Sequence, residues 1–147
     1  MSLSLKDYFK SYDLSGIQNK YADYLVKDII AQYYFSFGEY YFSGGDKKKS
    51  LENFEKCDQI GNDLEWVSNN LGVAYSEKGF KEKALEYAQK SVSVNPSSSR
   101  DYSNLGVMYY QQKKYNEAIE SYNKAIRLNG NYSEAYNFDI LFTAIDI

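Results

Sequence analysis

The sequence predicts an all-α protein, an α-solenoid of stacked antiparallel helical hairpins. Three observations lead to this prediction. Glycines recur every 34 residues, at Gly38, Gly72 and Gly106, and self-similarity at a fixed period of this length is the signature of a repeat architecture. Within each period, the apolar residues follow the 3.6-residue spacing of an α-helix. The 147 residues contain a single proline, which permits long helices because proline breaks them.

Each period opens with a helical segment that contains its glycine. A large apolar residue precedes the glycine and a tyrosine follows three positions after it, as Leu105 and Tyr109 do around Gly106. Glycine inside a helix costs roughly 1 kcal/mol relative to alanine. We therefore expect two helices to cross closely at this point, where only a missing side chain permits the approach.

Each period closes with a second helical segment. A polar or glycine-containing break separates it from the first segment, and a turn former ends it at Asn62, Pro96 or Gly130. Each unit is therefore expected to be two antiparallel helices joined by a tight turn. One such pair cannot bury its apolar face alone, so copies must stack.

Charged residues repeat at the same period on the second segment. A glutamate precedes a lysine by four positions in every unit, which is the favoured orientation on a helix surface and is worth roughly 0.2–0.5 kcal/mol per pair. We expect three surface ion pairs from these columns: Glu52 with Lys56, Glu86 with Lys90, and Glu120 with Lys124.

This pattern resembles the tetratricopeptide repeat. The resemblance implies a right-handed superhelix of three repeats, over residues 31–64, 65–98 and 99–132. The second unit keeps Leu71, Gly72, Tyr75, Ala84 and Pro96, and the first is a looser match through Tyr34, Phe37, Gly38, Tyr41, Phe54 and Cys57. The third matches best, with Gly130 in place of the closing proline, through Tyr102, Leu105, Gly106, Tyr109, Ala118, Tyr122 and Ala125.

Two flanks remain outside the three units. Residues 1–30 have helical apolar spacing and are interpreted as an N-terminal flank, with a degenerate capping hairpin as one reading. Residues 133–147 form either a capping helix or the first helix of a truncated fourth repeat. Phe138 and Phe142 make this segment apolar and favour the second reading, since a cap that faces solvent should be polar. An exposed apolar end would also invite a second copy to stack, giving a homodimer.

The composition excludes several classes of function. The net charge of −3 gives no basic footprint for nucleic acid, and no apolar run is long enough to span a bilayer. Histidine is absent and Cys57 is the single cysteine, so the commonest general base and metal ligand is missing and no internal disulfide can form. No catalytic or phosphate-binding motif is present. We expect a cytoplasmic protein that is not an enzyme and holds no cofactor or metal.

The resemblance implies a protein-interaction scaffold or adaptor. In the family, the first helix of each unit lines a concave groove that receives an extended peptide or a partner helix. The alternative is a structural segment of a larger protein, acting in self-association or as a regulatory spacer. The residues expected in the groove are Phe35, Glu39, Asn69, Asn70, Val73, Arg100, Ser103, Asn104, Val107, Tyr110 and Asn137.

The asparagines of this set suggest how a peptide would be bound. An amide offers both a hydrogen-bond donor and an acceptor, so amides stacked at one height, such as Asn70 and Asn104, would bind a peptide backbone without reading its sequence. The alternative is a solvated polar helix face. Some members of the family grip a C-terminal carboxylate with lysines and asparagines at the positions of Phe35, Glu39, Asn70, Arg100 and Asn104. Here Glu39 would repel a carboxylate, which argues against that ligand.

Overall fold

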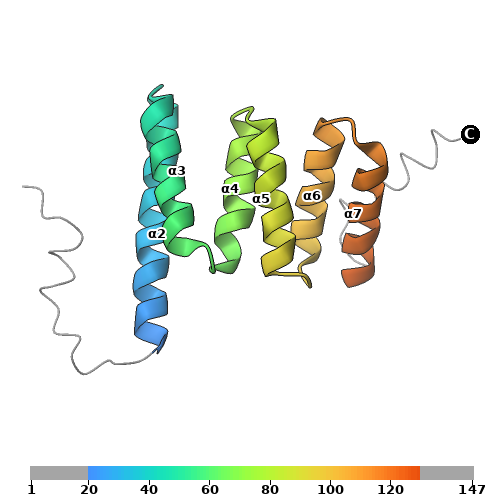
Figure 1. Ribbon diagram of the computed structural model, residues 1–147, viewed down its shortest axis with the longest axis horizontal. Helices are drawn as coiled ribbons and strands as arrows, with labels where there is room; N and C mark the ends of the chain where they lie inside the picture. The colour runs from blue at the N-terminus through green and yellow to red at the C-terminus, as the bar shows by residue number, and fades with distance from the viewer. Residues whose placement is uncertain (1–19, 130–147) are drawn as a thin grey trace, which may run out of the picture.

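The chain forms a row of antiparallel α-helices. The computed structural model describes residues 20–129, and within this range there are six helices and no strand. The predicted all-α stack of hairpins is confirmed (Figure 1). Predictions for residues 1–19 and 130–147, including the C-terminal segment, lie outside the described residues. The helices are α2 Lys20–Ser43, α3 Lys47–Gly61, α4 Glu65–Glu77, α5 Lys81–Val94, α6 Ser99–Gln111 and α7 Tyr115–Leu128.

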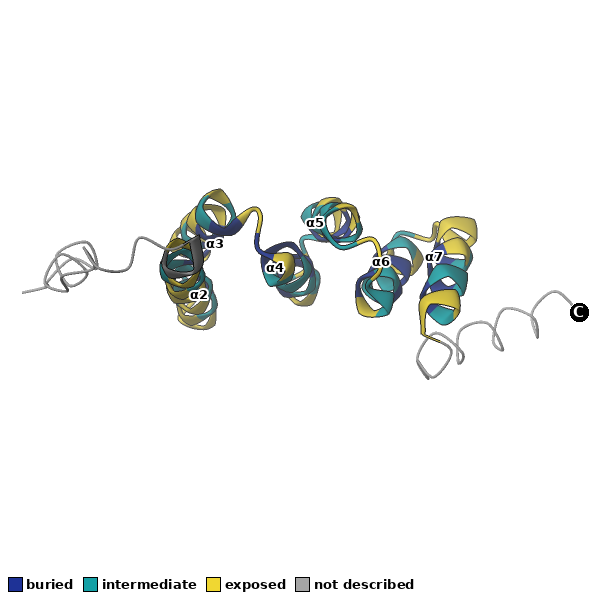
Figure 2. Cartoon of the chain, turned by 90° about the horizontal axis from the view of Figure 1, so that it is seen from below, coloured by how far each residue is buried: buried dark blue, intermediate teal, exposed yellow. Residues whose placement is uncertain are grey.

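The helices pair into three hairpins, α2 with α3, α4 with α5, and α6 with α7. The hairpins follow one another along the long axis of the molecule (Figure 1). Seen along the helices, α2, α4 and α6 lie on one side of the row and α3 and α5 on the other (Figure 2). We call α2, α4 and α6 the first helices, because each opens its hairpin.

The turns inside the hairpins share one conformation. Gly45 and Gly79 have φ angles of +85° and +82°, and Lys113 occupies the equivalent position of the third turn with a φ of 61°. This left-handed conformation is open to glycine but costs other residues about 1–2 kcal/mol. The third hairpin therefore retains the turn geometry of the first two although its sequence lacks the glycine.

The close helix crossings expected at the repeated glycines are confirmed. A Cβ atom placed on Gly106 would lie 2.8 Å from the ring of Tyr122, and one on Gly72 would lie 3.3 Å from the backbone nitrogen of Ala88. The space that a side chain would need is therefore filled by the second helix of the same hairpin.

Helix α2 is longer than its counterparts, with 24 residues against 13 in α4. It begins at Lys20 and runs without interruption through the expected boundary between residues 30 and 31. No glycine or proline lies between Ile29 and Tyr34 to end a helix. Residues 20–30 are thus the N-terminal part of the first hairpin's own helix.

The core is continuous across the hairpins, but the two junctions between them differ. The first junction is aromatic: the ring of Phe54 lies 5.5 Å from that of Tyr75, and Tyr75 stacks on Tyr87 at 5.3 Å. The second junction contains a buried polar contact. There Ser91 Oγ donates a hydrogen bond to the buried Asp101 carboxylate at 2.5 Å.

The surface ion pairs expected within the second helices do not form. Between residues 20 and 129, no ion pair joins a glutamate of this column to the lysine four positions later. Lys90 instead reaches Asp58 of the preceding hairpin at 2.5 Å. Lys56 and Lys124 lie over the rings of Tyr34 and Tyr102. An aromatic face or an acid on a neighbouring helix competes with a solvated pair that is worth only a few tenths of a kcal/mol.

No helix within the described range has both the length and the apolar character needed to cross a membrane.

Candidate functional site

The predicted groove residues lie on the first helices. We call the exposed side of α2, α4 and α6 the first-helix face. Residues Phe35 and Glu39 come from α2, Asn69, Asn70 and Val73 from α4, and Arg100, Ser103, Asn104, Val107 and Tyr110 from α6. Asn137 lies outside the described residues.

Two adjoining hollows run between α2 and α4 on this face. One has a volume of about 320 Å³ and is lined by Phe35, Glu39, Asn70, Val73, Ala74 and Glu77. The other, of about 310 Å³, is lined by Gln32, Phe35, Ser36, Trp66 and Asn70. Both share Phe35 and Asn70, so the structure brings these two predicted residues together although they are a full repeat apart in sequence.

A third hollow of about 210 Å³ continues the face toward α6. It contains Asn69 and Asn70 from α4 and Arg100 from α6, with Glu65 and Trp66 beside them. The three hollows together form a surface depression that crosses the first two hairpins and reaches the third.

The asparagines are linked to one another. Asn104 Nδ2 donates to Asn69 Oδ1 at 2.6 Å, and Asn69 Nδ2 donates to Asn70 Oδ1 at 3.5 Å. All three side chains are half-buried. Among the described residues, this chain of amides leaves a donor at Asn70 and an acceptor at Asn104 without a protein partner. The short bond between Asn69 and Asn104 therefore orients these two amides before any ligand arrives.

Trp66 belongs to this face, which the sequence did not indicate. Its indole Nε1–H donates to Asp28 Oδ1 at 2.6 Å, and its ring meets that of Phe35 edge-on at 6.0 Å. Trp66 was not among the residues expected in the groove. Its position three residues before Asn69 was the available signal, since residues three apart share a helix face.

Glu39 is held by a buried cation. Lys78 Nζ lies 2.7 Å from Glu39 Oε1, and the lysine side chain is only 5% exposed while that of Glu39 is 40% exposed. The ammonium also lies 4.9 Å from the ring centre of Phe42 and 5.6 Å from that of Phe54. The ion pair joins the first hairpin to the second. Helical spacing gives no signal for it, because the partners belong to different hairpins.

Four predicted residues line none of the three hollows. One of them, Asn104, is connected to the face through its hydrogen bond to Asn69. Ser103 is buried, with 1% exposure, and does not present its side chain at the surface. Val107 packs against the cluster around Ala118, and the ring of Tyr110 lies 5.6 Å from that of Tyr115 at the start of α7. The depression therefore rests on α2, α4 and the N-terminal half of α6.

A further hollow among the described residues lies on another surface. It measures about 440 Å³ and lies between α6 and α7, next to Tyr102, Leu105 and Tyr109. Tyr109 accepts a hydrogen bond from Gln89 of α5 at 3.0 Å, which places this hollow beside the second junction. Ser121 lines it, one period after Tyr87. The third hairpin therefore has a serine beside this hollow where the second hairpin has a tyrosine.

The single cysteine has low reactivity. Cys57 is buried, and burial, with a smaller contribution from the Asp58 charge, raises the pKa of its thiol to about 12. The thiol is therefore protonated at neutral pH, and the protonated form is a poor nucleophile and metal ligand.

Comparison with known proteins gives one consistent result. Two family models, both describing the tetratricopeptide repeat, match residues 99–135 and residues 31–60 and 67–98, about two thirds of the chain. No curated protein sequence matches at a significant level.

Solved structures share the fold. The first such domain of Spaghetti (RPAP3), bound to the HSP90 peptide SRMEEVD, is 22% identical over 80% of this chain and 94% of its own, with a TM-score of 0.66. The Sgt2 domain from Aspergillus fumigatus is 24% identical over 79% of both chains, with a TM-score of 0.64. The Arabidopsis OM64 domain has a TM-score of 0.67 at 14% identity, over 80% of this chain and 98% of its own.

Proposed function

Because this chain belongs to the tetratricopeptide-repeat family, we propose that its first-helix face captures an extended peptide segment of a partner protein. Tetratricopeptide repeats are protein-interaction scaffolds, and the chain acts as one. The observation that carries the proposal is the row of hydrogen-bonded amides of Asn70, Asn69 and Asn104, beside the hollows between α2 and α4. We call it the amide row. The groove positions listed from the sequence are proposed as contacts only where they border these hollows or belong to the amide row.

The amides suit a peptide backbone. An extended strand presents alternating N–H and C=O groups, and the open ends of the amide row are a donor at Asn70 and an acceptor at Asn104. Because Asn69 holds both neighbours, little side-chain entropy remains to be lost on binding. Phe35 and Trp66 supply the aromatic surface that anchors interfaces, with a polar handle at the indole.

The Spaghetti structure supports a peptide as the kind of partner, since that domain holds the HSP90 peptide SRMEEVD. The same ligand does not fit this chain. The peptide is acidic, whereas Glu39 and Glu77 both line the hollow between α2 and α4. We therefore propose a different peptide class for the same face.

Two further properties are part of the proposal. Tetratricopeptide-repeat proteins are generally non-enzymatic, and we propose that this segment acts by binding alone. We also propose a reducing compartment such as the cytoplasm, which suits a chain whose one cysteine is free and buried.

Selection from a random peptide library tests the function. The bait is the full chain, compared with a variant carrying Asn70→Ala and Asn104→Ala. We expect peptides selected by the parent chain to bind the variant at least tenfold more weakly, because each lost amide removes hydrogen bonds worth about 0.5–1.5 kcal/mol.

The control variant carries Asn116→Ala and Asn123→Ala, the same chemical change placed on α7. Circular dichroism confirms equal helix content for the three proteins. Capture by the first-helix face is refuted if no peptide is enriched, or if both double variants bind the selected peptides as the parent does.

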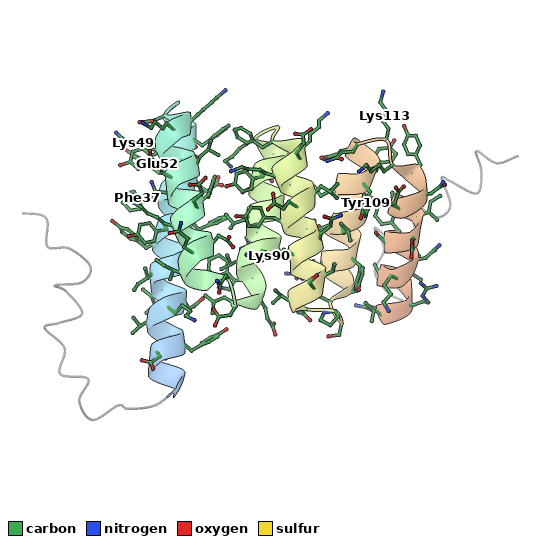
Figure 3. All side chains as sticks on the ribbon, viewed as in Figure 1. Phe37, Lys49, Glu52, Lys90, Tyr109 and Lys113 are labelled. Carbon is green, nitrogen blue, oxygen red and sulfur yellow. The ribbon has the colours of Figure 1, made fainter. Side chains whose placement is uncertain are left out.

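One observation favours self-association as a second candidate. Tyr33 and Tyr40 are 39% and 70% exposed on the outer side of the first hairpin, where Figure 3 also shows Phe37. Val67, Leu71 and Ala74 occupy the same positions one period later and are buried. This outer face has the register of a junction between hairpins, so a second copy is the proposed occupant. Sedimentation velocity tests it: Tyr33→Glu with Tyr40→Glu, or charges at Phe138 and Phe142, should abolish any dimer.

A further inference from the structure

We propose that the partner segment carries a lysine or arginine whose side chain enters the hollow lined by Phe35, Glu39, Asn70, Val73, Ala74 and Glu77. We call this hollow the acidic hollow. The inference rests on the proposed capture of a peptide by the first-helix face, and it names the chemistry that gives that capture its specificity.

The size and walls of the acidic hollow fit one long side chain. Its volume of about 320 Å³ is at the low end of the range for ligand pockets, about 300–1,000 Å³. Phe35, Val73 and Ala74 provide apolar surface for the methylene stem. Lysine and arginine bury such stems along apolar surface while their charged ends stay with polar groups.

The charges favour a cation over an anion. Glu39 and Glu77 contribute two carboxylates, and Lys78 offsets one of them through its bond to Glu39 Oε1. Glu77 is exposed and forms no ion pair with any residue between 20 and 129. One negative charge therefore remains without a counterion, and an aspartate or glutamate of the partner would be repelled.

Lys78 prepares Glu39 for this role. A carboxylate has about four acceptor positions on its two oxygens, and the contact with Lys78 uses Oε1 only. The Glu39 side chain stays 40% exposed, so Oε2 can accept from a partner cation. Because the buried ammonium fixes the carboxylate, the acceptor is oriented before binding, and less side-chain entropy is lost when the cation arrives.

The position of the acidic hollow connects it to the amide row. Asn70 belongs to both, as the last amide of the row and as part of the hollow's lining. A peptide whose backbone follows the amides would thus place a side chain next to Phe35 and Glu77. Arg100 lies in the hollow toward α6, beyond Trp66, so its positive charge is at the other end of the face.

A charge-reversal experiment tests the inference. Peptides are selected from a random library by the parent chain and by a Glu77→Lys variant, and the best parent peptide is resynthesised with its basic residue changed to glutamate. We expect the parent to enrich lysine or arginine at one position and to lose at least tenfold in affinity for the glutamate peptide. The Glu77→Lys variant should reverse this preference.

The control is Glu86→Lys, which changes net charge equally at an exposed position on α5. It should keep the parent's preference. The inference is overturned if the enriched position is acidic or neutral, or if Glu77→Lys selects the same peptides as the parent. Such peptides would still depend on Asn70 and Asn104 if the first-helix face is the binding site, which separates failure of this inference from failure of the proposed function.

Discussion

Three groups at the first junction, two of them buried and one half-buried, lose their ordinary acidity. Burial is the largest cause in each case, because it disfavours the charged form. It raises the pKa of the Cys57 thiol to about 12, and it raises the pKa values of Tyr75 and Tyr87, with Glu55 or Asp58 adding negative charge nearby. All three groups are neutral in the folded chain over the physiological range.

Stability should therefore fall in alkali. In the unfolded chain these groups ionise near pH 9–10, while in the folded chain they stay neutral to higher pH. A raised folded pKa contributes stability below the unfolded pKa, and that contribution is lost as pH rises through the folded pKa. We expect the urea midpoint to drop progressively above about pH 9. Tyr75→Phe should cost little at pH 7, because its buried hydroxyl has no hydrogen-bond partner in residues 20–129.

The Tyr75→Phe variant should also lose less stability between pH 7 and pH 10.5 than the parent. Tyr40→Phe, at a residue 70% exposed, is the matched control and should follow the parent. Equal losses for all three proteins would show that burial of the Tyr75 hydroxyl does not set the alkaline limit.

Sequence reasoning at the residue scale succeeded where one hairpin contains both partners. The close approach at Gly106 involves Tyr122 of the same repeat unit, so the missing side chain had a local explanation. It failed for the lysine columns and for Trp66. Lys90 and Trp66 find Asp58 and Asp28 on other hairpins, and no periodic pattern in a single sequence encodes which hairpin surfaces will meet.

At the scale of elements, the ion pairs distinguish the two junctions. The first junction is bridged by Lys78 with Glu39 and Lys90 with Asp58. At the second junction, the hydrogen bonds use neutral donors, as in Ser76 with Gln111 at 2.9 Å. The sequence predicted the helices, their order and their pairing, because these follow from apolar period and turn residues. It did not predict this difference, which depends on contacts between units.

Removing the two partners of the Lys78–Glu39 pair should have unequal effects. Glu39→Gln leaves a nearly buried ammonium without its carboxylate, and we expect a loss of about 1–3 kcal/mol in the free energy of unfolding. Lys78→Met keeps the stem between Phe42 and Phe54 and leaves a carboxylate that reaches water, so it should cost less. Urea denaturation of both variants measures this difference.

Lys27→Met is the reference for an exposed pair, because Lys27 and Asp63 are 38% and 59% exposed. Its effect should stay within about 1 kcal/mol. A larger loss in Lys78→Met than in Glu39→Gln would mean that the ammonium stabilises the junction mainly through contacts other than Glu39, such as the rings of Phe42 and Phe54.

For the whole molecule, stability should be greatest in the middle. In a stack of repeats, each unit is stabilised mainly by its neighbours, and the hairpin of α4 and α5 packs on both sides. It also contains fully buried side chains such as Leu71 and Tyr75. At the other extreme, Tyr24, Leu25 and Ile29 of α2 are about half exposed.

Amide hydrogen exchange should therefore be slowest in α4 and α5 and fastest in the first turns of α2. Mass spectrometry of peptic fragments measures this directly. Uniform protection across the described helices would indicate a single cooperative unit and contradict the gradient.

The ion pairs of the first junction limit how the repeat array can grow by duplication of a hairpin. If the hairpin of α4 and α5 were copied in tandem, the new Lys78 would face the position one period after Glu39, and the new Lys90 the position one period after Asp58. Those positions are Val73 and Val92. Both copied cations would lose their carboxylates, one of them at a nearly buried site. A lineage that lengthened this protein would have to replace these lysines as well as insert the unit, so the middle hairpin is modular in shape but not in charge.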